Sequence, residues 1–316
     1  MFHWDNGLKL TKADLAVDIG RRQPRAFISH AHTDHIARHQ FALCTPETAA
    51  LYHLRLGRRP TLKMPYGKTI QWGDLLLTTY PAGHCLGSAM LLAEDDGQSL
   101  LYTGDFKLSE SATAQRAELP RADILIIEST YGHPKYRLPP RDEAVGQLIV
   151  TVQSALEQDC VPVIYAYALG KAQEVTKLLT AAGIPVLQHP KVFEVSQVYR
   201  QCGVDLGRFE LLADGVEPGW AVVVPPRSPP LRCKKRQLRL AVTGWAISSR
   251  AKYWLDVDCA IALSDHADYD QLLEAVQRVE PRVVYCTHGP HEFVDCLREA
   301  GYNAYPLGQP RQGLLW

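Results

Sequence analysis

Several features of secreted and membrane proteins are missing from this sequence. Its eight cysteines include no Cys-x-x-Cys pair, which argues against a structural zinc knuckle or a disulfide framework. No apolar run approaches the ~20 residues that a membrane-spanning helix needs, and the N-terminus has no charged-then-apolar signal pattern. These absences predict a protein of the reducing cytoplasm that has no membrane partner.

A net charge is also missing. The chain has 34 Lys and Arg against 34 Asp and Glu, so an anionic substrate would have to be attracted by local patches or by bound metal. Its 316 residues, 46% hydrophobic and 22% charged, are ordinary for a soluble enzyme with a substantial core. The length fits one large domain or two smaller ones.

Histidine and aspartate are concentrated in one short stretch. The stretch contains His30, His32, Asp34 and His35. In an extended segment His30 and His32 point the same way, because side chains two apart share a face. Asp34 and His35 follow a turn, in an expected short helix over 33–38, and would address a second ion. The stretch therefore predicts a site for two divalent cations, and a polar loop with several histidines by accident is the competing interpretation.

Ligand-type residues also follow four later apolar strands. They are His84 after strand 75–80, Asp105 after 100–103, Glu128 after 124–127 and His288 after 283–287. A lone histidine of this kind is more often a turn residue, and a lone carboxylate is more often a helix cap. Their repetition at strand ends favours a metal site on one edge of a sheet.

Strands and helices alternate in the rest of the chain, which predicts an α/β fold with a parallel sheet covered by helices. A helix with Thr45 as its N-cap is expected first. The later helices are expected over 142–156, 171–182, 191–201, 269–279 and 291–300, and the strands over 161–165, 184–187, 220–224, 238–242 and 258–263.

The segment 225–239 is the most basic part of the chain. It carries six basic residues, no acidic residue and four prolines, so an exposed and stiff loop is expected. A solvated loop and a nucleic-acid contact are both open interpretations. The candidate contacts are Arg232, Lys234, Lys235 and Arg236.

Together these motifs resemble the metallo-β-lactamase superfamily. The resemblance rests on His30-x-His32-x-Asp34-His35, on His84 in Gly-His-Cys-Leu-Gly-Ser and on Asp105 in Tyr-Thr-Gly-Asp. Glu128 in Glu-Ser-Thr-Tyr-Gly, His266 in Ser-Asp-His-Ala-Asp and His288 in Thr-His-Gly-Pro look like the three extra motifs of its β-CASP branch. The resemblance implies an αββα sandwich built from 1–161 and 247–316, with a small α/β β-CASP insert at 162–246.

The resemblance also implies two divalent ions, Zn²⁺ or Mn²⁺. His30, His32 and His84 would hold one ion, Asp34, His35 and His288 would hold the other, and Asp105 would bridge them. Asp34 then counts as a catalytic residue together with His266 and Glu128.

The last two residues would form a proton-transfer pair. His266 would lie at the leaving-group side, with Glu128 or Asp268 as the partner that orients it. Ser88, Lys107 and Ser129 are near the motifs and could line a pocket for a terminal phosphate, with surface or capping roles as the alternative.

The implied function is a metal-dependent nuclease that hydrolyses phosphodiester bonds. In size the chain is most similar to compact bacterial DNA exonucleases associated with DNA ligases, which implies a role in DNA repair with a ligase and a helicase as partners. His288 points instead to RNA, because the DNA-cleaving subgroup resembling Artemis carries an aliphatic residue there. A β-CASP ribonuclease is therefore the alternative.

Two other function classes compete less well. A small-molecule hydrolase of the same superfamily would explain the first motifs but not Glu128, His266 and His288. A binding subunit without metal would have lost ligands, whereas every expected ligand position is filled in this sequence.

Overall fold

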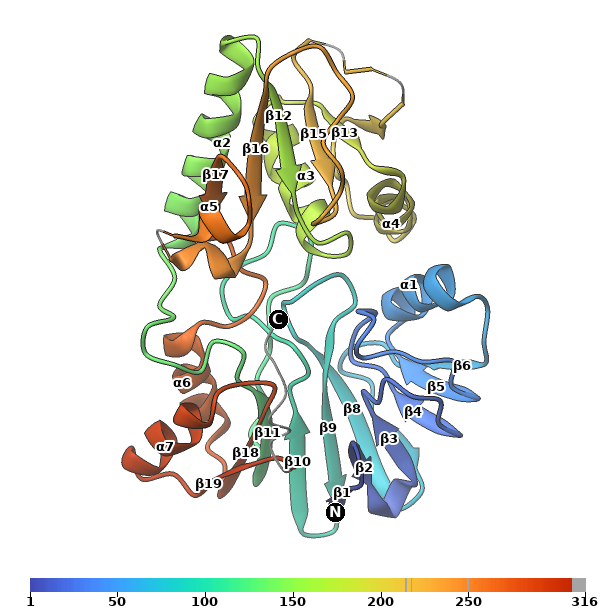
Figure 1. The fold of residues 1–316 in the computed structure, drawn as a ribbon. Coiled ribbons are helices and arrows are strands. Elements are labelled where there is room, and N and C mark those ends of the chain that lie inside the picture. Colours follow the sequence, from blue (N-terminus) through green and yellow to red (C-terminus); the bar gives the residue numbers. More distant parts are fainter. Residues whose placement is uncertain (214, 217, 249, 309–316) are drawn as a thin grey trace. The chain divides into compact units, whose positions relative to one another are not determined.

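The computed structural model describes residues 1–213, 215–216, 218–248 and 250–308. The chain forms two compact units (Figure 1). The first contains Met1–Leu108, Gln115–Tyr136 and the chain from His266 on, and the second contains Ser109–Ala114 and Arg137–Asp265. The second unit is wider than the insert expected at 162–246, whose assignment as a β-CASP domain stays a prediction.

Two sheets make up the first unit. One runs in chain order and consists of β1 (Phe2–Trp4), β2 (Leu8–Leu10), β3 (Leu15–Val17), β4 (Arg25–Phe27), β5 (Phe41–Cys44) and β6 (Thr61–Lys63). The other has the order β19 (Ala304–Pro306), β18 (Val283–Thr287), β11 (Ile124–Glu128), β10 (Gln98–Tyr102), β9 (Ala89–Asp95), β8 (Leu75–Pro81) and β7 (Ile70–Trp72).

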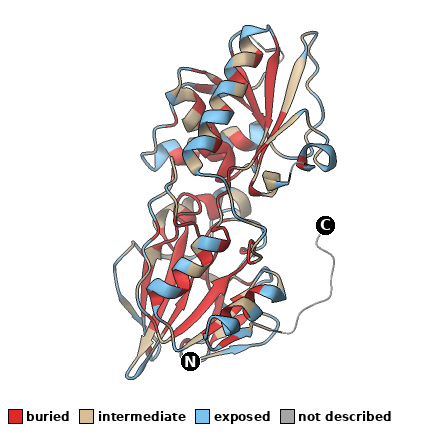
Figure 2. Ribbon diagram, turned by 90° about the vertical axis from the view of Figure 1, so that its left-hand side faces the viewer, coloured by how far each residue is buried: buried red, intermediate tan, exposed pale blue. Residues whose placement is uncertain are grey.

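Strict alternation along the strands explains how these sheets pack. In β11, Ile124 and Ile126 join the core between the two sheets, whereas Leu125 and Ile127 face the core under α6 (Tyr269–Val279) and α7 (His291–Glu299). On the far side of the first sheet, Ala42 and Tyr52 belong to a third core under α1 (Pro46–Leu56). The layers are therefore α, β, β, α, which confirms the expected sandwich, and Figure 2 shows its strands as mostly buried.

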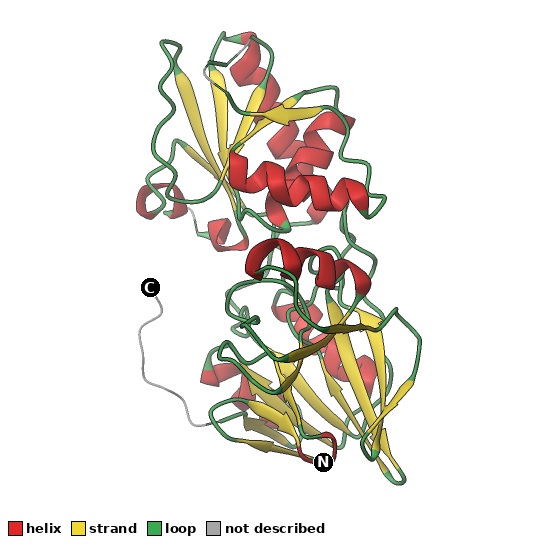
Figure 3. Cartoon of the chain, turned by 90° about the vertical axis from the view of Figure 1, so that its right-hand side faces the viewer, coloured by secondary structure: helices red, strands yellow, loops and turns green. Residues whose placement is uncertain are grey.

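The second unit is built on one parallel sheet. Its order is β14 (Phe209–Leu211), β13 (Val186–Gln188), β15 (Ala221–Val224), β12 (Val161–Tyr165), β16 (Gln237–Val242) and β17 (Cys259–Ile261). Its helices are α2 (Arg141–Glu157), α3 (Lys171–Ala181), α4 (Pro190–Gln201) and the short α5 (Ala251–Trp254). Figure 3 shows helices of this unit gathered on one side of the strands.

The boundaries of the second unit follow from packing. Helix α2 contacts β12 and β17, and β17 pairs with β16. Helix α2 and strand β17 therefore belong to the second unit, although both lie outside 162–246. The proline-rich segment also takes part, because Leu231 and Cys233 pack on the apolar face formed by Val161, Val163 and Val222.

One expected element is wrong. Residues 33–38 form no helix; 33–35 make a single turn. The carbonyl of Ala37 accepts a hydrogen bond from the Tyr52 hydroxyl at 2.7 Å, and helix α1 thereby holds this segment in an irregular path. None of the helices in the described part of the chain is both long and apolar enough to cross a membrane, while the cytoplasmic location stays a prediction.

Candidate metal centre

The strand ends bring the predicted ligands to one edge of the first unit. Strands β10, β11 and β18 are parallel neighbours, so Asp105, Glu128 and His288 lie at or just past the same edge. Strand β8 runs in the same direction as β10, since both are antiparallel to β9, and the turn after it carries His84. Strand β4 of the other sheet leads into the histidine-rich stretch.

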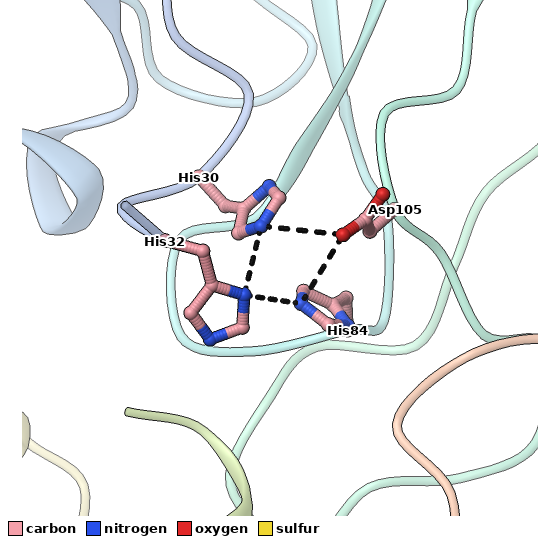
Figure 4. Close-up of side chains that lie close together, drawn as sticks. All are labelled: His30, His32, His84 and Asp105. Carbon is pink, nitrogen blue, oxygen red and sulfur yellow. Dashed lines mark hydrogen bonds and ion pairs between the residues drawn. The ribbon is translucent and has the colours of Figure 1, made fainter. Parts of the chain in front are cut away.

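Four of these side chains converge on one point (Figure 4). His32 Nδ1 lies 3.0 Å from His30 Nε2 and 3.1 Å from His84 Nε2. Asp105 Oδ2 lies 3.5 Å from His30 Nε2 and 4.0 Å from His84 Nε2. We call these four residues the first metal group.

A second group shares Asp105 with the first. It consists of His35, Asp105 and His288. His35 Nε2 lies 3.4 Å from Asp105 Oδ2 and 3.5 Å from Asp34 Oδ2. Asp34 is thus close to this group, although its side chain is 77% exposed. Asp105 Oδ2 thus lies close to a histidine of each group, and Asp105 is common to both.

The donor set fits zinc. With Zn–N bonds of about 2.0–2.1 Å, ligand atoms around a tetrahedral ion are about 3.3 Å apart. The four separations in the first metal group, from 3.0 to 4.0 Å, span that value. Imidazole and carboxylate are also the ligands that zinc takes in sites with an open coordination position. These residues can therefore hold metal ions, and their assignment as individual ligands stays a prediction.

His288 is held in an unusual backbone conformation. Its φ is +56°, in the left-handed region that residues other than glycine rarely adopt. Gly289 comes so close to Ser129 that an added Cβ would lie 1.9 Å from the Ser129 carbonyl oxygen. This tight turn after β18 brings the His288 ring to within 5.6 Å of the His35 ring, centroid to centroid.

Asp18 is a residue of the site that the sequence reasoning missed. Its Oδ1 accepts from the Ser29 amide at 2.7 Å, and its Oδ2 accepts from the Tyr102 hydroxyl and lies 2.9 Å from His35 Nδ1. The Ser29 hydroxyl also donates to Asp18 and lies 2.9 Å from His30 Nδ1. Asp18 thus orients the second metal group directly and the first through Ser29.

A signal for Asp18 was present in the sequence. It follows the apolar strand β3, as Asp105 and Glu128 follow or end theirs. The aspartate after β3 also has a φ of +47°, which turns the chain away from the strand.

The predicted acid and its partner form a second pair at the same edge. His266 Nδ1 lies 2.9 Å from Glu128 Oε1. Glu128 is buried, and its two oxygens accept from the amides of Phe106 and Thr130 at 3.2 and 3.1 Å. The ring of His266 lies 4.7 Å from that of His84. Asp268, the other partner considered, caps α6 by accepting from the Gln271 amide at 3.0 Å.

Burial and charge set the protonation of the core ligands. Burial holds the pKa of His30 well below its usual value, so its imidazole is neutral and able to bind metal. Burial also works against charge on His35, but the carboxylates of Asp105 and Asp18 outweigh it and hold the pKa of His35 well above its usual value. The hydrogen bond with His35 lowers the pKa of Asp34 to about 2.

Three of the predicted substrate contacts are buried. The Ser88 hydroxyl accepts from the amides of His84 and Cys85, and the Ser129 hydroxyl donates to the Thr287 carbonyl. Lys107 is buried beside the His84 turn. Ser88 and Ser129 thus make hydrogen bonds to the backbone, and a phosphate contact by any of the three stays a prediction.

The four basic residues predicted to contact nucleic acid differ in their exposure to solvent. Arg232, Lys234 and Arg236 are exposed. Lys235 is half-buried and forms an ion pair with Asp159. Their contact with nucleic acid stays a prediction.

Known proteins resemble this chain along its length. The family described as the Zn-dependent metallo-hydrolase RNA specificity domain, RMMBL, matches residues 254–305. The "Probable DNA ligase" of Opitutus terrae is 37% identical over 320 residues, which cover 98% of this chain and 32% of that protein. These matches support the resemblance to the metallo-β-lactamase superfamily and its β-CASP branch.

Two further relatives match shorter parts of the chain. The cleavage and polyadenylation specificity factor subunit 3 of Dictyostelium discoideum is 33% identical over 168 residues, 52% of this chain and 21% of that protein. Endoribonuclease YSH1 of Yarrowia lipolytica is 34% identical over 141 residues, 43% of this chain and 17% of that protein. The chain thus spans about a third of the length of the first relative and about a fifth of the other two.

Proposed function

We propose that this protein is a metal-dependent nuclease that hydrolyses phosphodiester bonds. The observation that carries the proposal is that Asp105 is common to two adjacent ligand groups beside the His266–Glu128 pair. Two ions in such groups, once bound, supply an activated water and neutralise charge on a phosphodiester. That chemistry needs no other cofactor.

The residues of the chain then have separate tasks. The buried Glu128 fixes the His266 ring by accepting from Nδ1, which leaves Nε2 as the nitrogen that gives a proton to the departing oxygen. Asp18 keeps Nδ1 of His35 engaged, so that Nε2 faces Asp105 and the second metal group. Ser29 does the same for His30.

DNA is the substrate that we propose first, with exonuclease activity in DNA repair. The relative that matches 98% of this chain is named a probable DNA ligase, and the match covers about a third of it. A nuclease fused to or acting with a ligase would prepare DNA ends for joining. A DNA ligase and a helicase are accordingly the partners that we propose.

RNA is the second candidate. The matching family is described as an RNA specificity domain, and one relative is named an endoribonuclease. A histidine at position 288, close to His35 and Asp105, also favours an RNA-cleaving enzyme.

A parallel digestion separates these candidates. The purified protein, with its metal content measured by mass spectrometry, is incubated with end-labelled DNA and RNA of one sequence, with zinc or manganese added. Preferential release of mononucleotides from DNA supports the DNA exonuclease, and preferential cleavage of RNA, at its ends or internally, supports the ribonuclease. An absence of cleavage of both polymers at full metal occupancy would exclude a nuclease.

A further inference from the structure

Three aromatic side chains of the second unit are exposed to solvent. Tyr253 is 74% exposed, Trp254 is 58% exposed and Tyr167 is 50% exposed. Large exposed aromatic groups are unfavourable in water unless they meet a partner, so a cluster of them marks a contact surface. Neither the metal groups nor the His266–Glu128 pair uses these residues.

The topology of the sheet places these rings along one edge. Strands β15, β12 and β16 are parallel neighbours, so the segments that leave them start at the same edge (Figure 1). Tyr167 follows β12, Arg227 follows β15, and Trp245 follows β16 in the short helix η2 (Gly244–Ile247).

Helix α5 extends this line of aromatic residues. It packs against η2 and β17 and presents Tyr253 and Trp254, both exposed, next to each other. Trp245 is half-buried in η2, the element that α5 packs against. We call Tyr167, Trp245, Tyr253 and Trp254 the aromatic edge.

Basic groups are interleaved with these rings. Arg250 and Lys252 are exposed, and Lys252 Nζ lies 5.1 Å from the centroid of the Tyr253 ring. Arg227 is close enough to Tyr167 to oppose the increase in the pKa of that phenol that burial and Asp265 cause.

The two acids that follow α5 share one basic partner. Asp256 and Asp258 follow α5, and both bind Arg239, at 3.2 and 3.6 Å. Arg239 offsets one of these two negative charges, and with Arg250 and Lys252 the segment carries three positive charges against two negative ones.

We propose that the aromatic edge is a stacking platform for single-stranded nucleic acid. Unpaired bases stack on aromatic side chains while basic groups contact the phosphates, a combination that tolerates any sequence. Bases in a duplex have no free face for this contact. The proposal rests on the nuclease function and adds to it a preference for substrates with a single-stranded segment.

Binding to labelled oligonucleotides tests the platform. Fluorescence anisotropy measures the Kd of the holoprotein for a phosphorothioate-linked oligothymidylate, which slows cleavage, and for the same strand in a duplex. Because a base–aromatic stack contributes about 1–3 kcal/mol, Tyr253→Leu and Trp254→Leu should each weaken single-strand binding by about fivefold or more. Tyr253→Phe keeps the ring and should bind like the wild type.

Matched controls lie in the first unit. Tyr305 and Trp4 are each 44% exposed, and Tyr305→Leu and Trp4→Leu should leave binding within about twofold of the wild type. Lys252→Gln should reduce the salt slope by about one. Unchanged single-strand binding by Tyr253→Leu and Trp254→Leu, as expected for a protein-docking surface, would overturn the proposal, and so would an equal loss on the duplex.

A small substrate separates this proposal from the nuclease function. Bis(p-nitrophenyl) phosphate has a phosphodiester but no base, so the aromatic-edge variants should hydrolyse it at the wild-type rate. If the wild type fails to hydrolyse this diester while Tyr253→Leu weakens single-strand binding, the nuclease function is contradicted and the platform is supported. The opposite pattern would retain the function and exclude the platform.

Discussion

At the scale of single residues, buried carboxylates hold histidine rings in fixed orientations. Asp18 binds Nδ1 of His35, and Glu128 binds Nδ1 of His266. In both pairs the carboxylate is itself held by other donors, which are the Ser29 and Tyr102 groups for Asp18 and two backbone amides for Glu128. Such outer partners fix the tautomer of a ring and the direction of its other nitrogen.

Removing the acceptor of His35 should weaken metal binding. In Asp18→Asn an NH₂ group replaces one carboxylate oxygen. The NH₂ group cannot accept the hydrogen bonds that His35, Ser29 or Tyr102 donate. We expect an affinity for metal about 10- to 100-fold lower, measured by competition with a chromophoric chelator. Tyr102→Phe removes one donor and keeps the carboxylate, so its loss should be smaller. Equal affinity in Asp18→Asn and the wild type would contradict the orienting role.

The His266–Glu128 pair should affect turnover and leave metal content unchanged. His266→Gln removes the proton donor, and Glu128→Gln removes the charge that orients it. General acid catalysis contributes about 10²- to 10⁴-fold, so each variant should lose kcat within that range. Cleavage rate and bound metal are measured on the same preparations. His291→Gln, an exposed histidine in α7, is the control. Near-normal kcat in His266→Gln would exclude the proposed role.

At the scale of elements, the turn that carries His84 is attached to the start of α1. The Gly87 carbonyl accepts from the hydroxyls of Thr45 and Thr48 at 2.7 and 2.8 Å. Thr45 is at the same time the N-cap of α1, accepting from the Thr48 amide. The helix start and the metal-binding turn therefore hold each other in place.

The close approach at Gly87 can be tested with a matched glycine. A Cβ at Gly87 would lie 2.6 Å from the Thr48 amide nitrogen, whereas one at Gly57 would meet nothing within 4 Å, and the two φ angles are +77° and +80°. Both Gly→Ala changes also place a Cβ on a backbone of positive φ, which has a cost of its own. Gly87→Ala should lose about 1–3 kcal/mol more in urea unfolding, from overpacking, together with metal affinity. Equal losses in the two variants would contradict this account.

At the scale of the whole molecule, all the residues that we assign to the two metal groups belong to the first unit. The second unit has its own core under a six-stranded sheet. Two cores of this kind are expected to unfold in two steps rather than in one.

Removal of the metal by a chelator should therefore lower the Tm of only one of the two unfolding transitions. Metal that binds the folded state at 100 times its Kd adds about 2.7 kcal/mol of stability, or roughly 5–10 °C in Tm for a unit of this size. Calorimetry with and without a chelator should show one transition moved down by that amount and the other unmoved. Leu148→Ala, in the core of α2, should lower the transition that the chelator leaves in place. Movement of both transitions with the chelator would contradict independent units.

Local patterns were sufficient for the regular elements. The helix 269–279 and the strand 161–165 have the bounds that their sequences predict, because apolar periodicity and the Asp268 cap are encoded within a few residues. The turn at 33–35 was mistaken for a short helix, because the contact from Tyr52 to Ala37 that holds it comes from a distant segment.

The sequence by itself determined which residue types the centre would contain, since histidine and carboxylate spacing and the strand-end pattern are local properties of the chain. Tertiary structure decided how these residues are grouped. It brings Asp105 to both His30 and His35, places the Asp18 side chain, which is 2% exposed, against His35, and buries Ser88 and Ser129 inside the fold. These outcomes depend on closing loops of tens of residues onto one sheet edge, and no short window of sequence contains the contacts that select them.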